Sequence, residues 1–151
     1  MQIQPYLFFN GNCEEAFTFY EKALGGKINE LHRYEDMPPQ EGGDQDNGCG
    51  PMTPEEKAAF GKRIMHVNLT VDGQMMLMGS DSPQDEGTVR GLSISIGIEN
   101  VEKGREIFKA LSGGGEVKMP FQETFWAKGF GMCTDKFGVP WMVNAGDKPS
   151  P

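Results

Sequence analysis

Two successive stretches of the chain show the same order of hydrophobic patterns. In the first, a short apolar run typical of a buried strand precedes apolar residues at helical spacing and then three strand-like segments. The Gly25-Gly26 pair ends the helix, and Asp72-Gly73 is a strong signal for a two-residue hairpin. The predicted elements are a strand over 5–9, a helix over 13–24, and strands over 27–34, 64–71 and 74–78. A polar loop is expected from Gly79 to Arg90.

The second stretch repeats this pattern. Its predicted elements are a strand over 91–98, a helix over 101–111, and strands over 116–121, 125–133 and 139–145. The helix ends also resemble each other, because Glu21-Lys22-Ala23-Leu24 precedes two glycines and Phe108-Lys109-Ala110-Leu111 precedes three. An aromatic tail follows, in which Phe125-Trp126 and Val139-Pro140-Trp141 flank a tight turn at residues 135–138. The sequence therefore predicts a duplicated unit of strand, helix and three strands.

Both predicted helices begin with residues that favour a capped N-terminus. Asn12 is expected to cap the first helix, with Glu15 completing a capping box, and Asn100 is expected to cap the second. In the segment 35–62, which interrupts the first unit, Thr53-Pro54-Glu55-Glu56 predicts a short helix over 54–60.

The rest of this inserted segment is rich in proline and glycine, so it is expected to be a loop. Its carboxylates do not follow the regular spacing of a calcium-binding loop, which favours a solvated loop over a cation site. These carboxylates are Glu35, Asp36, Glu41, Asp44 and Asp46.

The fold class that follows is α+β, with two βαβββ units in a single domain over 1–151. The first unit covers 1–80, with the insertion 35–62, and the second covers 91–145. Each unit should form a curved, mostly antiparallel sheet, and pairing of the units should create a trough between the sheets. Ligand sites favour concave, partly apolar surfaces of this kind. A closed core without a cavity is the alternative.

Composition excludes several classes of function. The chain has 151 residues and a net charge of −8, and such a surface repels nucleic acid and anionic membranes. No apolar run approaches the length of about 18 residues that spans a bilayer, and no signal peptide is visible. The cytoplasm is therefore the expected compartment. Cys13 is expected on a helix, Cys133 in a strand and Cys49 in a polar loop, a spacing that favours neither a disulfide framework nor a metal site.

The repeat and the aromatic tail together resemble a known family. The chain is similar to the PhnB-like branch of the vicinal oxygen chelate superfamily, which includes glyoxalase I, bleomycin-resistance proteins and extradiol dioxygenases. The motifs that carry the resemblance are Pro5-Tyr6-Leu7-Phe8-Phe9 with Gly11, Glu15-Ala16 and Phe19-Tyr20 before Gly25-Gly26, His66-Val67-Asn68-Leu69, and the aromatic tail. They cover nearly the full length, but the branch has no settled common activity.

The resemblance implies a divalent metal in the trough, held by histidine and glutamate side chains from the first and fourth strands of each unit. The corresponding strands here carry Tyr6 and Phe8, the run 75–78 (Met-Met-Leu-Met), Ser93 and Ser95, and Met142. None of these supplies a usual ligand, so no metal or other cofactor is predicted. An unusual site with His66 and Glu123 or an acidic loop residue is the alternative to an ordinary strand histidine.

Members of the branch have also been labelled methyltransferases of ubiquinone biosynthesis. That activity would need a glycine-rich turn directly after a strand, to hold the methyl donor. Here Gly113-Gly114-Gly115 follows a helix, where glycines serve as a C-cap and turn. The sequence therefore does not support the label.

Eight residues are candidates for a ligand pocket in the trough. Aromatic rings would supply flat apolar surfaces, and polar groups would orient a small ligand, with Lys128 suited to a carboxylate or phosphonate. The ten methionines of the chain would give such a pocket an adaptable wall. The candidates are Trp126, Phe130 and Trp141, with Tyr6 and Phe8 expected opposite them, and the polar residues Lys128, His66 and Asn144. For each of them, a place in the core or facing water is the alternative.

Three hypotheses for function follow. The first is a binding protein for a small ligand that uses no metal. The second is a metal-dependent isomerase, lyase or dioxygenase with a non-standard ligand set. The third is a protein that acts through its dimer surface, with a filled trough. A homodimer is expected in each case, because open sheets have edges that must be paired or covered.

Overall fold

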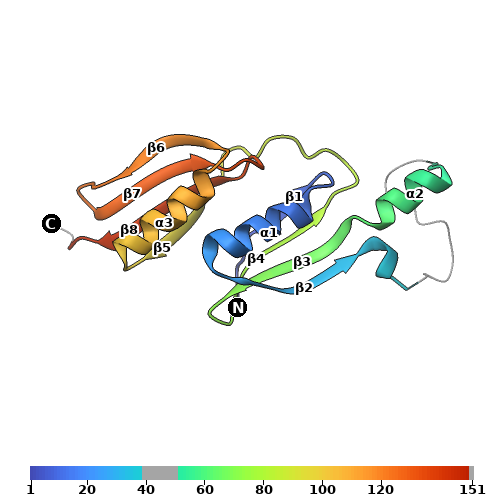
Figure 1. Ribbon diagram of the computed structural model, residues 1–151, viewed down its shortest axis with the longest axis horizontal. Coiled ribbons are helices and arrows are strands. Elements are labelled where there is room, and N and C mark those ends of the chain that lie inside the picture. The colour runs from blue at the N-terminus through green and yellow to red at the C-terminus, as the bar shows by residue number, and fades with distance from the viewer. Residues whose placement is uncertain (39–50, 150–151) are drawn as a thin grey trace. The chain divides into compact units, whose positions relative to one another are not determined.

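The computed structural model describes residues 1–38 and 51–149 (Figure 1). The chain divides into two compact units, with the boundary between Gly87 and Thr88. The expected loop contains four residues that lie outside the described part of the chain, so their placement stays a prediction. They are Glu41, Asp44, Asp46 and Cys49. Within the described part of the chain, no helix has both the length and the apolar character needed to cross a membrane.

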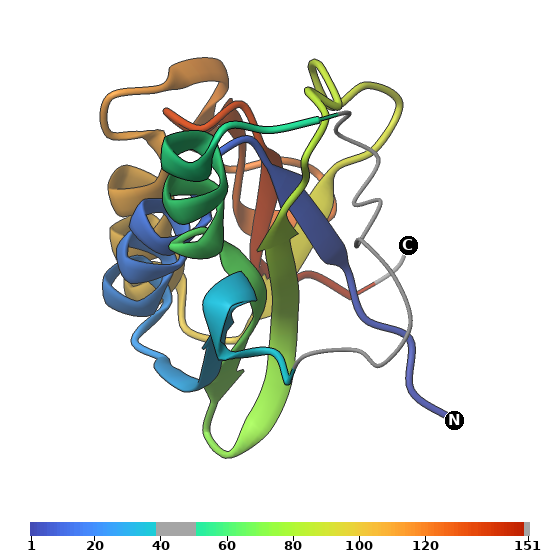
Figure 2. The same cartoon turned by 90° about the vertical axis from the view of Figure 1, so that its right-hand side faces the viewer.

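Unit 1 is a four-stranded sheet with a helix on one face. Its elements are β1 (Tyr6–Phe9), α1 (Cys13–Leu24), β2 (Lys27–Arg33), the 3-10 turn η1 (Tyr34–Asp36), α2 (Pro54–Gly61), β3 (Ile64–Val71) and β4 (Gln74–Asp81). The strand order is β1-β4-β3-β2, with β1 parallel to β4 and the other pairs antiparallel. Figure 2 shows α1 to the left of β4 in this unit.

Unit 2 repeats this topology without the insertion. Its elements are β5 (Ile94–Ile98), α3 (Val101–Ser112), β6 (Glu116–Gln122), β7 (Ala127–Thr134) and β8 (Pro140–Asp147). The order β5-β8-β7-β6, with β5 parallel to β8, matches the order of unit 1 strand for strand. The α+β class and the predicted duplication are therefore confirmed.

In each unit, an aromatic side chain of the helix lies against a glycine of the sheet. A Cβ atom at Gly79 would come within 2.6 Å of the Phe17 ring of α1, and one at Gly131 would come within 2.7 Å of the Phe108 ring of α3. The cores of both units lie on this helix side. The buried strand residues there include Leu7, Phe9, Val67, Leu69 and Leu77 in unit 1, and Ala127, Cys133, Trp141, Val143 and Ala145 in unit 2.

The turns and caps agree with the sequence, with one exception. Asp72 and Gly73 both have positive φ, as a two-residue hairpin requires, and Thr53 forms the expected capping box with Glu56. Asn100 accepts a hydrogen bond from the backbone N–H of Lys103, as predicted. Asn12 occupies the N-cap position of α1, as predicted, but its side chain does not make the expected capping hydrogen bond.

Asp81 takes the place of the expected Asn12 cap. Its Oδ1 accepts hydrogen bonds from the backbone N–H groups of Gly11 and Cys13 at 2.8 and 3.0 Å, and its Oδ2 accepts one from Ile64 at 2.9 Å. Asp81 is 2% exposed and pairs with Phe9 of β1. Strand β4 therefore runs three residues beyond the predicted end at Met78, and residues 79–81 belong to a strand rather than to the predicted polar loop.

Candidate functional site

The face of each sheet opposite its helix carries most of the predicted pocket residues. We call this surface the far face of the unit. Along each strand, successive side chains alternate between the helix side and the far face. On the far face of unit 1 lie Tyr6 and Phe8 from β1, Met78 and Ser80 from β4, His66 and Asn68 from β3, and Glu30 and His32 from β2.

Three predicted residues form one cluster on the far face of unit 1. The hydroxyl of Tyr6 lies 3.3 Å from Nδ1 of His66, so the Tyr6 side chain spans β4 to reach β3. The ring centroids of Tyr6 and His66 are 5.9 Å apart, and those of Tyr6 and Phe8 are 5.1 Å apart. Tyr6 and Phe8 remain 37% and 56% exposed, so this aromatic surface is accessible.

Asn68 lies beside this cluster and has an unusual environment. It is 1% exposed, and its Nδ2 donates a 2.9 Å hydrogen bond to Oε2 of Glu30. Its Oδ1 is buried and has no hydrogen-bond partner among the described residues. Most buried polar atoms in proteins are hydrogen-bonded, so an unpaired one calls for an explanation. In the sequence, Asn68 is a polar position of an alternating strand and part of the motif His66-Val67-Asn68-Leu69, and neither feature indicates an unpaired amide oxygen.

The far face of unit 2 holds a second group of predicted residues. Nε1 of Trp126 donates a 3.1 Å hydrogen bond to Oδ1 of Asn144, whose Nδ2 donates in turn to Asp147. The Trp126 and Phe130 ring centroids are 5.2 Å apart. Lys128 is exposed and stands on the same side of β7 as Phe130 by strand alternation. The fold thus brings Trp126, Phe130 and Asn144 together, with Lys128 next to them in sequence.

A groove of about 420 Å³ opens beside the start of β8 and the end of β7 in unit 2. The far-face residues Met132 and Thr134 form part of its wall, and Lys118 adds a cation that is paired with Glu116 at 2.7 Å. The Oγ atom of Ser93 in this wall is buried and lacks a hydrogen-bond partner within the described part of the chain. The lining residues are Gly91, Leu92, Ser93, Lys118, Met132, Cys133, Thr134, Pro140 and Trp141.

Trp141 lines this groove but belongs to the core of unit 2. Its side chain is 1% exposed, and its Nε1 donates a 2.8 Å hydrogen bond to Oδ2 of Asp135. On β8 it occupies the same side as Val143 and Ala145, both fully buried. Of the eight predicted pocket residues, Trp141 is therefore the one whose ring the fold encloses.

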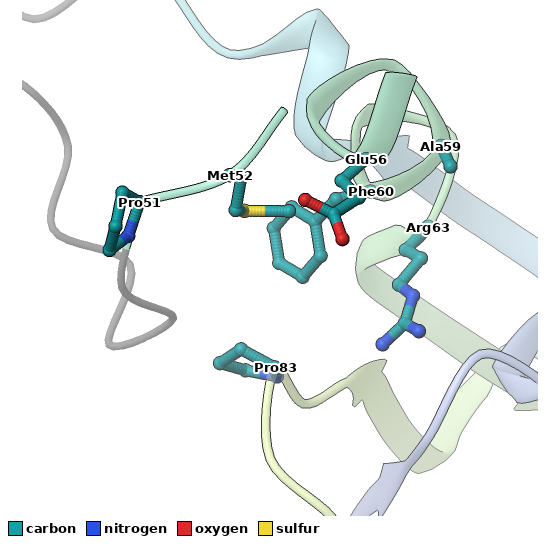
Figure 3. Close-up of a pocket in the computed structure, with 7 residues that line it drawn as sticks. All are labelled: Pro51, Met52, Glu56, Ala59, Phe60, Arg63 and Pro83. Atoms are coloured by element: carbon teal, nitrogen blue, oxygen red, sulfur yellow. The ribbon is translucent and has the colours of Figure 1, made fainter. Parts of the chain in front are cut away.

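A second groove, of about 500 Å³, lies in unit 1 next to α2 (Figure 3). The Arg63 guanidinium extends into it and donates hydrogen bonds to Oδ1 of Asn10 at 3.1 Å and to the carbonyl of Ser82 at 3.3 Å. Its Cζ lies 5.6 Å from the centre of the Phe60 ring. The groove is lined by Pro51, Met52, Glu56, Ala59, Phe60, Arg63 and Pro83. Sequence reasoning identified α2 but not this groove, because Pro83 and Arg63 meet only in the folded unit.

Metal ligands do not gather in the described residues. No group of three or more histidine, cysteine, aspartate or glutamate side chains there is placed to hold a metal ion. At the strand positions where the resemblance implies ligands, Tyr6 pairs with Met78 in unit 1 and Ser95 pairs with Met142 in unit 2. Glu123, named as a partner for His66, pairs with Lys148, and this contact lowers the pKa of the Glu123 carboxyl.

Neither described cysteine is a reactive thiol. Cys13 on α1 and Cys133 on β7 are free and buried, in the elements where the sequence placed them. Burial raises the pKa of Cys133 to about 11, with a contribution from the nearby Asp135 carboxylate. Burial, with Asp81 and Glu14, raises the pKa of Cys13 well above its ordinary value. Because the thiolate is the nucleophile, these groups are inert near neutral pH.

Comparison with known proteins gives a consistent relationship across the chain. Residues 2–143 match the family model of the Glyoxalase/Bleomycin resistance protein/Dioxygenase superfamily. Protein YjdN of Escherichia coli (strain K12) is 35% identical over 144 residues, which cover 95% of each chain.

Two solved structures extend this relationship. Protein PA1353 from Pseudomonas aeruginosa is 38% identical, with a TM-score of 0.77 over 96% of this chain and 97% of its own. A PhnB protein from Bacillus cereus, described as a putative 3-demethylubiquinone-9 3-methyltransferase, is 26% identical, with a TM-score of 0.70 over 96% of this chain and 99% of its own.

Proposed function

Because the chain belongs to the Glyoxalase/Bleomycin resistance protein/Dioxygenase superfamily and is PhnB-like, we propose that it binds a small molecule on the far faces of its sheets, without a glyoxalase-type metal. One observation supports this proposal above the others. Among the described residues, two buried side-chain polar atoms lack a hydrogen-bond partner, Asn68 Oδ1 and Ser93 Oγ, one in each unit. Asn68 belongs to the far face of unit 1, and Ser93 lines the groove that reaches the far face of unit 2. A bound ligand would supply the missing partners.

The side chains around these atoms suit a small organic ligand. Exposed or half-buried rings on both far faces offer apolar contact area, and Tyr6 and Trp126 each have their polar end fixed by a hydrogen bond to a neighbour. Lys128 would attract an anionic substituent of the ligand, and His66 and Asn144 would orient its polar groups. The half-buried Met78, Met132 and Met142 give both faces an adaptable wall.

A methyl transfer activity has no support in the chain's glycine-rich segment. Gly113 ends α3, with its N–H donating to the carbonyl of Ala110, and Gly114 has a φ of 74° in the turn before β6. The three glycines thus connect a helix to a strand, whereas a loop that holds a methyl donor would leave a strand and enter a helix. The name of the Bacillus cereus relative is therefore not carried over to this chain.

We also propose that the protein is a cytoplasmic homodimer. Strands β1 and β2 are the edges of one sheet, and β5 and β6 are the edges of the other. Edge strands present unpaired backbone groups that proteins usually pair or cover, and a second copy of the chain would do so. Light scattering on the purified protein tests the dimer, and a monomer across the working concentration range would exclude it.

Elemental analysis of gently purified protein is the first test of the proposed function. A thermal-shift screen should follow, with divalent metals and with benzoate, phenylphosphonate and benzamide as small probes. We expect no stoichiometric metal and a rise in melting temperature with at least one probe. Bound nickel, zinc, manganese or iron near one per chain, with matching stabilisation, would favour a metal-dependent isomerase, lyase or dioxygenase instead.

Variants of unit 2 then locate the binding surface. Phe130→Ala should weaken the probe response, because it removes a ring that packs on Trp126. Val117→Ala is the control, since this side chain of unit 2 is 47% exposed and pairs with Cys133, on the helix side of the sheet. Lys128→Gln should reduce the response to benzoate and phenylphosphonate more than the response to benzamide. Equal responses in all three variants would place the binding elsewhere.

A further inference from the structure

We propose that the far face of unit 1 recognises a positively charged amine, with Asn68 Oδ1 as the hydrogen-bond acceptor and the Glu30 carboxylate as the balancing charge. This inference rests on the proposed function, because it names the chemical group taken at one of the same two far faces. From the sequence, only an anionic group is expected on the ligand, a carboxylate or phosphonate near Lys128. The site at Asn68 adds a cationic group.

The orientation of the Asn68 side chain is fixed by its neighbour. A carboxylate can only accept hydrogen bonds, so the group of Asn68 that faces Glu30 must be the amide nitrogen. The 2.9 Å contact between Nδ2 and Oε2 therefore holds Oδ1 in the opposite direction. Rotating the amide by half a turn would set two oxygens against each other. The unpaired atom is thus an acceptor, and its missing partner must be a donor.

Because Asn68 is buried, leaving its Oδ1 atom without a hydrogen bond costs free energy. The side chain is 1% exposed, so Oδ1 does not exchange freely with bulk water. A buried acceptor left unpaired loses the full hydration of that atom. A ligand that donates a hydrogen bond to Oδ1 recovers this free energy, and the gain strengthens its binding. Met78, directly opposite Asn68 on β4, is half-buried and unbranched, so its side chain can shift to admit the donor.

The Glu30 carboxylate favours a positively charged donor on the ligand over a neutral one. Its carboxylate is exposed on the edge strand β2, and its second oxygen, Oε1, has no partner among residues 1–38 and 51–149. A carboxylate that is already directed at the Asn68 amide raises the affinity for a cation and lowers it for an anion. The net charge of −8 acts in the same direction at longer range.

The aromatic residues of this face suit the body of such a ligand. Tyr6 is paired with Met78, which in turn is paired with Asn68, so the three side chains form one row across the sheet. An ammonium group is attracted to the face of an aromatic ring, and the carbon skeleton next to it packs on the same surface. The row therefore offers an aromatic surface for the carbon skeleton at the Tyr6 end and a hydrogen-bond acceptor for the ammonium group at the Asn68 end.

The test uses three probes with nearly the same shape and different charge. These are 2-phenylethylamine, 2-phenylethanol and phenylacetate, titrated into the full chain while backbone amide shifts and melting temperature are recorded. We expect the amine to bind about tenfold more tightly than the alcohol, as one charge-assisted hydrogen bond supplies, and phenylacetate to bind most weakly on this face. The largest amide shifts should fall on β3 and β4.

Three variants separate the roles of the two residues. Asn68→Leu should remove the preference of the face for the amine, because it deletes Oδ1 with little change in volume. Glu30→Gln should weaken amine binding severalfold and leave alcohol binding unchanged. Glu106→Gln, which removes a carboxylate from the exposed surface of α3, is the control and should change neither.

The outcomes distinguish this inference from the proposed function. If the alcohol or phenylacetate binds on the far face as tightly as the amine, or if Asn68→Leu keeps the preference for the amine, the ammonium site is wrong and the ligand-binding surface stands. If none of the three probes shifts the β3 and β4 amides or the melting temperature, the result counts against both. If the amine binds with its shifts confined to other elements, the assignment to Asn68 fails.

Discussion

The indole nitrogen of Trp141 donates a 2.8 Å hydrogen bond to Oδ2 of Asp135, which lies six residues earlier in the chain. Oδ1 of the same carboxylate accepts the backbone N–H groups of Phe137 and Val139 at 2.8 and 3.0 Å. Asp135 is 3% exposed and Trp141 is 1% exposed. One buried carboxylate therefore fixes both the turn between β7 and β8 and the largest side chain of the unit 2 core.

Replacement of this carboxylate should destabilise the protein strongly. Asp135→Asn leaves one acceptor oxygen where two are used and directs an amide N–H at a buried donor, so we expect a loss of about 2–3 kcal/mol in the free energy of unfolding. Urea denaturation followed by tryptophan fluorescence measures it. Asp85→Asn is the matched control, because Asp85 also accepts the N–H two residues ahead, from Gly87, but is exposed. A loss of similar size in both variants would show that burial is not the cause.

The two long helices of the duplicated units should respond differently to loss of the asparagine at their N-termini. Asn100→Ala removes the acceptor of the Lys103 N–H and should cost about 1 kcal/mol. Asn12→Ala should cost no more than about 0.3 kcal/mol, since its side chain makes no capping bond and Asp81 serves α1 instead. Equilibrium denaturation of the two variants gives the comparison. Equal losses would contradict the assignment of the cap to Asp81.

The contrast between Asn12 and Asn100 shows where prediction from sequence succeeds and where it stops. Local signals placed the α-helices and strands of both units, because hydrophobic period, hairpin residues and glycines act over a few residues. The bounds were less exact, since β4 ends at Asp81 rather than at Met78 and β5 begins at Ile94 rather than at Gly91. The Asp72-Gly73 hairpin and the α2 capping box are examples. The cap of α1 comes from Asp81, about 70 residues away in the chain, so no local pattern could identify it.

The candidate site shows the same division. The sequence predicts one pocket that all eight candidate residues line, and this stays a prediction. The structure places Tyr6, Phe8 and His66 on one face and Trp126, Phe130 and Asn144 on another. The unpaired oxygen of Asn68 depends on how deeply a polar strand residue is buried and on the side chain that faces it from the next strand. The alternation of polar and apolar residues along one strand predicts neither the depth of burial nor the side chain that faces it.

The buried thiol of Cys133 predicts how stability changes with alkaline pH. Its pKa of about 11 in the folded chain exceeds the ordinary value of 9.0, so the unfolded chain releases this proton first. Stability contributed by the neutral thiol is therefore complete below about pH 9 and declines as the pH rises towards 11. In a Cys49→Ser background, Cys133→Ala should show a smaller decline than its parent between pH 8 and 11, as measured by urea denaturation.

Tyr34 provides an internal reference for that experiment. Burial and the Asp81 carboxylate raise the pKa of its phenol, so it should add a decline of the same sign in both proteins. The difference between parent and Cys133→Ala isolates the thiol. Parallel pH profiles for the two proteins would mean that Cys133 ionises as readily in the folded chain as in the unfolded one.

Asn68 should be a residue whose replacement leaves the fold intact or improves it. Asn68→Leu removes an unpaired buried acceptor and adds apolar contact, while the exposed Glu30 carboxylate that loses its donor can be hydrated instead. We therefore expect the free energy of unfolding to stay the same or to rise by about 1 kcal/mol. Asn144→Leu is the comparison, because both ends of that amide are paired, with Trp126 and Asp147, and its replacement should be destabilising. Denaturation of both variants without added ligand measures the difference. A large loss for Asn68→Leu would mean that its amide holds the β2–β3 pair together, and the unpaired oxygen would then need no ligand to explain it.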